Sequence, residues 1–112
     1  MMGRYQVRYA PQALEDLKDI YVYIAQELHQ RDTAAAQVNR IRAEIRSLDF
    51  LPLRYPCVDW EPWQSMGMRK VTVGNFLVFY IPDTQTVTVI RILYAGRDIA
   101  NLLSEQAAMP PC

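Results

Sequence analysis

The clearest indication of the fold comes from residues 68–94, MRKVTVGNFLVFYIPDTQTVTVIRILY. Three runs rich in β-branched and aromatic residues are separated by GN (74–75) and PDTQ (82–85). This pattern predicts a three-stranded antiparallel meander, with strands at 68–73, 76–81 and 86–94. Gly74 stands where a two-residue hairpin turn needs a positive φ. The run FLVFYI is apolar at every position, which is typical of a central strand.

The turn lengths predict which side chains share a face of the sheet. A two-residue loop at Gly74 and Asn75 pairs Val73 with Phe76 and Arg69 with Tyr80. A four-residue loop at 82–85 then adds Val87, Val89 and Arg91 to the face of Arg69, Val71, Val73, Phe76, Val78 and Tyr80. The opposite face is more apolar and is therefore the predicted helix-packed core; its residues are Leu77, Phe79, Ile81, Ile90 and Ile92.

The first half of the chain predicts one strand and two helices. RYQVRYA (4–10) alternates polar and apolar residues as a half-buried strand does. Apolar residues then recur at three- and four-residue spacing over 12–29, and again up to Phe50, with Asp32 or Thr33 as the cap of the second helix. The short break between them predicts an antiparallel hairpin.

The rest of the chain completes an α+β fold. The Pro-rich segment 51–63 reads as an ordered loop whose Trp60 and Trp63 pack onto the sheet or the helices. Residues 98–106 read as a short C-terminal helix. The expected order is N-terminal strand, two-helix hairpin, three-stranded meander and short helix. We expect one domain over 1–106 and a flexible tail over 107–112.

Composition narrows the class of protein. The 112 residues carry 12 Lys and Arg against 12 Asp and Glu, whereas dedicated nucleic-acid binders usually carry a basic excess. No apolar run approaches the roughly 20 residues of a membrane span, and MMGRYQVRYAPQ has no secretory pattern, so we expect a cytoplasmic protein. Cys57, Cys112 and His29 form no zinc-binding spacing, and we expect no metal, cofactor or disulfide.

Candidate functional residues gather near the end of the meander. RILYAGRD (91–98) holds Arg91, Tyr94 and Arg97, and the first meander strand adds Arg69 and Lys70. Such cations can stabilise the charge on a phosphate in a transition state, and a tyrosine can relay a proton. The structural alternative is a strand end followed by a helix with Asp98 as its N-cap. In that case Arg91 pairs with Asp98 or Glu105, and Arg97 lies in solvent.

This order of elements, with RKVTVGNFLVFY (69–80) and VIRILYAGRDIANLL (89–103), resembles the RelE/ParE superfamily of bacterial toxins over residues 4–105. The resemblance implies the toxin of a type II toxin–antitoxin module, which arrests growth and is neutralised by a cognate antitoxin. It places the antitoxin on exposed apolar surface, in a groove between the helical hairpin and the sheet. RelE-type members cut mRNA on the ribosome, whereas ParE-type members bind DNA gyrase.

The residues favour the ParE branch. The ribonuclease branch would have an arginine where Leu77 stands, a lysine at Met68 and a tyrosine at Leu103, and only Lys70 and Arg97 match its pattern. RILYAGRD is similar to the ParE-type segment RVLHGxRD, with Tyr94 in place of histidine and Ala95 in place of glycine.

We therefore expect a gyrase inhibitor that is not an enzyme, with Arg69, Arg91, Tyr94 and Arg97 in target binding and Asp98 as a structural cap. The alternative is a metal-independent, ribosome-dependent endoribonuclease using Lys70 and Arg97 with Arg69, Arg91 and Tyr94. A third alternative is a member that binds only its antitoxin.

Overall fold

The computed structural model describes residues 4–58 and 61–95. Its strands are β1 (Gln6–Tyr9), β2 (Arg69–Val73), β3 (Phe76–Pro82) and β4 (Thr86–Tyr94). Its helices are α1 (Pro11–Val22), continued by the π-helical η1 (Tyr23–Glu27), and α2 (Arg31–Arg46), with 3₁₀ turns η2 (Ser47–Asp49) and η3 (Pro52–Arg54). The predicted α+β class is confirmed. Trp60, the predicted helix 98–106 and the tail 107–112 lie outside the described residues.

The four strands form one sheet in the order β1-β4-β3-β2. The meander strands are antiparallel, and β1 extends the sheet by pairing in parallel with β4. The predicted register of the first hairpin is confirmed, since Val73 pairs with Phe76 and Arg69 with Tyr80. Gly74 takes φ +61° at the turn, as expected.

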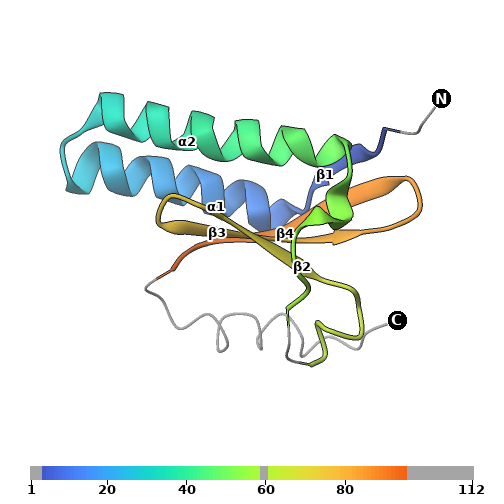
Figure 1. The fold of residues 1–112 in the computed structure, drawn as a ribbon. Coiled ribbons are helices and arrows are strands. Elements are labelled where there is room, and N and C mark those ends of the chain that lie inside the picture. The colour runs from blue at the N-terminus through green and yellow to red at the C-terminus, as the bar shows by residue number, and fades with distance from the viewer. Residues whose placement is uncertain (1–3, 59–60, 96–112) are drawn as a thin grey trace.

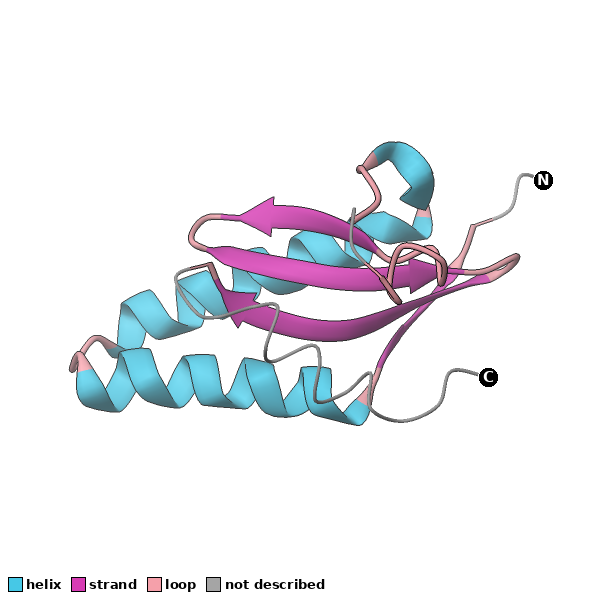
Figure 2. Cartoon of the chain, turned by 90° about the horizontal axis from the view of Figure 1, so that it is seen from below, coloured by secondary structure: helices cyan, strands magenta, loops and turns pink. Residues whose placement is uncertain are grey.

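The two helices lie side by side and antiparallel on one face of the sheet (Figures 1 and 2). Pro11 opens α1, where its missing N–H leaves no hydrogen bond unmade. Both helices turn apolar stripes toward the sheet. The buried residues of this main core are Ala13, Leu17, Ile20, Ile24, Ala34, Ile41, Ile45 and Leu48, with Val71, Val73, Val78, Tyr80, Val87, Val89 and Ile92 from the strands.

The predicted cap of α2 is wrong. Asp32 and Thr33 lie inside the helix, and the N-cap is Gln30, which makes no side-chain capping hydrogen bond. The chain reverses sooner than expected because His29 takes a left-handed conformation with φ +55°, and the backbone N–H of Gln30 donates to the carbonyl of Ile24.

The predicted helix-packed face of the sheet is also wrong. The helices cover the face that carries Val71, Val78 and Tyr80. A register shift between Phe79 and Tyr80 pairs Tyr80 with Val89 but Phe79 with Arg91. This β-bulge moves Arg91 off the face of Val87 and Val89 and moves Ile92 onto it, so strict alternation fails along β4.

The other face of the sheet carries a second, smaller core. Trp63 lies buried there with Val58, Met68, Phe79 and Leu93, and Leu77 and Ile81 pack against this cluster. The prediction that Trp63 packs onto the sheet is therefore confirmed. In the part of the chain that is described, no helix has the length and apolar character to cross a membrane.

Candidate functional site

Arg91 is bound to Asp16 of α1. The Arg91 Nε lies 2.8 Å from Oδ2 of Asp16, and Nη2 lies 3.1 Å from Oδ1, so the pair is bidentate. The same carboxylate accepts the backbone N–H of Ile92 at 2.9 Å. The two side chains are only 12% and 7% exposed. Asp98 and Glu105, the alternative partners from the sequence, lie outside the described residues.

The role of Asp16 was missed in the sequence, although a signal for it exists. Asp16 occupies the same helical stripe as Ala13, Leu17 and Ile20, at the spacing of core residues. A carboxylate on a buried stripe needs a charged or hydrogen-bonding partner. The presence of Asp16 therefore predicts a basic partner on a neighbouring strand, and that partner is Arg91 of β4.

Arg69 is also engaged within the protein. Its Nη1 donates to the carbonyls of Leu53, at 3.1 Å, and Tyr55, at 2.6 Å. The neighbouring Tyr80 hydroxyl donates to the carbonyl of Pro52 at 2.6 Å, and burial raises the pKa of Tyr80 to about 12. Arg69 and Tyr80 together hold the η3 segment against the edge of the sheet.

A third group of polar contacts lies beside η3. Arg54 Nη2 donates to the Ser47 hydroxyl at 2.8 Å, and its guanidinium lies 4.8 Å from the centre of the Tyr55 ring. The Tyr55 hydroxyl donates to the Glu44 carboxylate, and this hydrogen bond raises the pKa of Tyr55. These contacts tie the end of α2 to the segment that follows it.

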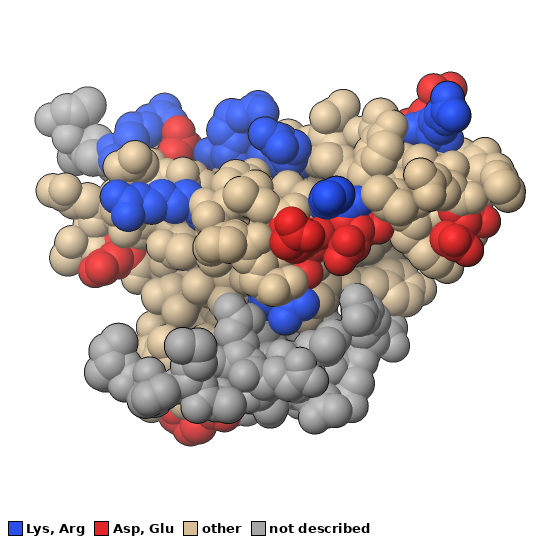
Figure 3. Space-filling view, turned by 180° about the vertical axis from the view of Figure 1, so that it is seen from behind, with Lys and Arg blue, Asp and Glu red and all other residues tan. Residues whose placement is uncertain are grey.

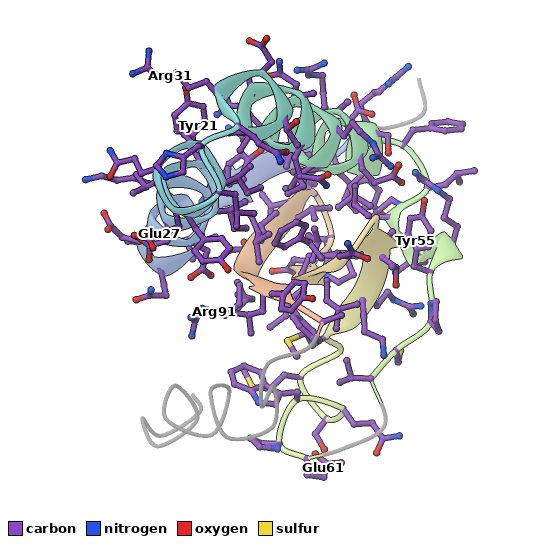
Figure 4. The ribbon with its side chains drawn as sticks, turned by 90° about the vertical axis from the view of Figure 1, so that its left-hand side faces the viewer. Tyr21, Glu27, Arg31, Tyr55, Glu61 and Arg91 are labelled. Carbon is purple, nitrogen blue, oxygen red and sulfur yellow. The ribbon has the colours of Figure 1, made fainter. Side chains whose placement is uncertain are left out.

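The predicted site residues that the structure describes do not converge on one point. Arg69 binds the carbonyl of Tyr55. Figure 4 shows Tyr55 and Arg91 at opposite sides of the molecule, so Arg69 and Arg91 do not share a site. Tyr94 is half exposed and packs edge-on against Phe76, with ring centres 5.8 Å apart. Lys70 lies on β2 with no ion pair among the described residues. Arg97 and Asp98 lie outside the described residues.

Within the described residues, no three His, Cys, Asp or Glu side chains are placed to hold a metal ion. An open hollow lies instead at the turn of the helical hairpin; it is lined by Tyr21, Ala25, Gln26, His29, Gln30, Arg31, Asp32 and Thr33. Among residues 4–58 and 61–95, the predicted cations Arg69 and Arg91 bind groups within the protein and do not gather around one point.

Comparison with known proteins identifies the family. Residues 7–99 match the model of the ParE toxin of the type II toxin–antitoxin system parDE. No curated protein matches the chain.

The fold is similar to that of solved toxins. The chromosomal ParDE system of P. aeruginosa matches at 19% identity and a TM-score of 0.68, covering 81% of this chain and 96% of that one. The RelBE2 complex of Mycobacterium tuberculosis matches at 21% identity and a TM-score of 0.58, covering 81% and 98%. YafQ of E. coli matches at 18% identity and a TM-score of 0.55, covering 88% and 98%. By its family match and fold, the chain belongs to the ParE toxins of type II toxin–antitoxin systems, within the RelE/ParE superfamily.

Proposed function

We propose that this toxin arrests growth by binding and inhibiting DNA gyrase, and that a cognate antitoxin neutralises it. The observation that carries the proposal is the internal engagement of Arg69 and Arg91. Ribonucleolytic catalysis without a metal needs cations poised around the scissile phosphate. Both arginines are instead anchored inside the fold, and Leu77 packs against the second core. These contacts favour action by binding over catalysis.

The charge pattern of the helical face supports a protein target. Most exposed charges of α2 are basic, whereas most of those on α1 and η1 are acidic. Those of α2 are Arg31, Asp32, Arg40, Arg42 and Arg46, and those of α1 and η1 are Glu15, Lys18, Asp19 and Glu27. Figure 3 shows the basic side chains along one side of this face and acidic ones below them. An RNA or ribosome surface would favour a continuous basic stripe. The mixed pattern is more typical of a surface that contacts proteins.

The proposal predicts inhibition of supercoiling in a purified system. Relaxed plasmid, gyrase and ATP are incubated with increasing toxin, and supercoiled product is measured on agarose gels. We expect inhibition at micromolar toxin, because a protein-binding toxin needs no further component, and relief by prior addition of equimolar antitoxin.

A matched assay follows transcript cleavage in a reconstituted translation reaction. Full supercoiling activity at micromolar excess of folded toxin would contradict the proposal. Cleavage of ribosome-bound mRNA that is lost in Lys70→Ala or Arg97→Ala would identify the ribonuclease instead. Antitoxin binding without either activity would identify a member that binds only its antitoxin.

The antitoxin is proposed to dock on the outer side of the helical hairpin. The space between the hairpin and the sheet is filled by buried side chains, so it offers no open groove to a partner. Leu14 and Tyr21, 51% and 40% exposed, lie seven residues apart on one face of α1, and Tyr21 borders the hollow described above. We call Leu14, Tyr21 and this hollow the hairpin surface. Its spacing suits an amphipathic helix laid along α1.

Removing the apolar side chains of the hairpin surface is expected to weaken antitoxin binding. Leu14→Ala/Tyr21→Ala should raise the Kd of the antitoxin at least tenfold, measured by titration calorimetry, because it deletes two anchors from a docked helix. Tyr23→Ala is the matched control, since Tyr23 is 56% exposed but lies on another side of the helix. Equal Kd values for the double variant and the control would exclude this surface.

A further inference from the structure

The segment that follows α2 exposes three large apolar side chains in a row. Phe50, Leu51 and Leu53 are 52%, 59% and 56% exposed, and only Pro52 between them is buried. Surface loops usually carry polar residues, and a run of exposed apolar residues is unfavourable unless it serves a function. We call these residues the 50–53 loop.

Side-chain hydrogen bonds fix the backbone of the 50–53 loop. Its carbonyls at Phe50 and Leu51 accept from Arg54, that of Pro52 accepts from Tyr80, and that of Leu53 accepts from Arg69. Polar side chains thus satisfy the backbone and leave the apolar side chains pointing outward. A loop fixed in this way loses little freedom when it binds.

The conformation of Leu51 is strained. It takes φ +52° and ψ 55°, the left-handed region that bulky L-residues avoid. Such strain persists only where surrounding contacts impose it, and it is concentrated at functional sites. Here the contacts from Arg54, Tyr80 and Arg69 hold the neighbouring carbonyls, and the result is a fixed backbone with exposed apolar side chains.

The exposure and charge of the 50–53 loop define its partner. Apolar side chains that are each more than half exposed do not enclose a small molecule, whose sites are concave. The edge of the loop carries the arginines Arg4, Arg46 and Arg54 against the carboxylates Glu44 and Asp49, which leaves one positive charge in excess. The Arg4 side chain is 65% exposed, and its guanidinium carbon lies 5.5 Å from the centre of the Phe50 ring. The partner surface that complements this loop is an apolar pocket bordered by carboxylates, on a folded protein.

We propose that the 50–53 loop inserts into an apolar, acid-rimmed pocket of gyrase, an inference that rests on the gyrase function proposed above. The loop follows the C-terminal end of α2, whereas the hollow of the hairpin surface lies at the turn between the helices, the opposite end of the hairpin (Figure 1). The target and the antitoxin then use different surfaces of one small domain. Phe50 and Leu53 are the anchors, and Leu51 completes the apolar surface.

The test compares Phe50→Ala/Leu53→Ala with the unmodified protein and with Tyr23→Ala, which removes a similarly exposed ring at the other end of the hairpin. We expect the toxin concentration for half-maximal inhibition of supercoiling to rise at least tenfold in the double variant and to stay within twofold in the control. The Kd for antitoxin should stay within twofold in both. A second variant, Leu51→Gly, removes the side chain while relieving the backbone strain, and it should also weaken inhibition.

The outcomes separate the two proposals. No inhibition by the unmodified protein removes the gyrase function and this docking surface with it. Unchanged inhibition by both folded loop variants overturns the docking surface alone. Loss of antitoxin binding in the loop variants, with inhibition intact, assigns the loop to the antitoxin. A change from dimer to monomer in light scattering, with inhibition intact, assigns it to a second copy of the chain.

Discussion

Replacing Asp16 by asparagine is expected to lower the free energy of unfolding by about 3 kcal/mol, measured by urea denaturation. The substitution keeps the shape of the side chain but removes the charge that compensates Arg91, and both groups are almost fully buried. It also weakens the acceptor for the Ile92 backbone N–H. Arg91 would then remain buried without a counter-charge, which costs much more than losing an exposed ion pair.

The matched control is Asp49→Asn, which breaks the ion pair between Arg4 and Asp49. Those side chains are 65% and 34% exposed, so the expected loss is below about 1 kcal/mol. Equal losses in the two variants would contradict the structural role of Asp16.

The double variant Asp16→Leu/Arg91→Met tests whether Arg91 also contacts the target. Replacing both partners of a buried pair by apolar side chains of similar size is often neutral for stability. Here the variant also leaves the Ile92 backbone N–H without its acceptor, so some loss of stability is expected. If this variant folds and still inhibits gyrase, Arg91 serves the fold alone. If it folds and inhibition is lost, the predicted role of Arg91 in target binding gains support.

Replacing Arg69 by methionine is expected to lower the free energy of unfolding by about 2 kcal/mol. Its guanidinium supplies the hydrogen bonds to the carbonyls of Leu53 and Tyr55, and methionine retains only the apolar stem. The measurement is again urea denaturation. We also expect faster proteolytic cleavage within residues 50–55, because the segment loses its attachment to β2.

Lys70→Met is the control for that variant, because Lys70 neighbours Arg69 and forms no ion pair within the described part of the chain. We expect it to change stability by less than about 0.5 kcal/mol. A loss in Lys70→Met as large as that in Arg69→Met would show that the hydrogen bonds of Arg69 do not account for its effect.

The fold could largely be predicted from local patterns in the sequence. The two-residue turn at Gly74 determines the first hairpin register, and the helices follow from their apolar stripes. The helix-packed face could not be predicted from apolar content, because both faces of β3 are buried: Phe79 packs under Trp63 in the second core. The bulge beside Tyr80 further breaks the alternation along β4, so that Ile92 changes face. A bulge of this kind depends on how β4 packs, and the turn residues carry no sign of it.

The candidate site was harder to predict than the fold. Arginines that could bind a phosphate look the same in sequence as arginines that bind a buried carboxylate or backbone carbonyls. Arg91 meets Asp16 across 75 residues of chain, and Arg69 meets Leu53 across 16. Such pairs depend on tertiary contacts. The buried position of Asp16 on its helical stripe was nevertheless readable, whereas the exposure of Phe50, Leu51 and Leu53 was not, because an apolar run indicates burial.

Because β1 pairs in parallel with β4, the sheet cannot be completed until late in synthesis of the chain. Gln6 pairs with Thr86, so β1 leaves the ribosome 80 residues before its partner strand. At about 5–20 residues per second, this interval is roughly 4–16 s. Throughout it, the nascent chain lacks the strand that joins β1 to the meander and supplies Arg91 to Asp16. A fragment released before β4 is made cannot assemble the sheet, so translation must pass residue 94 before the domain can fold and act.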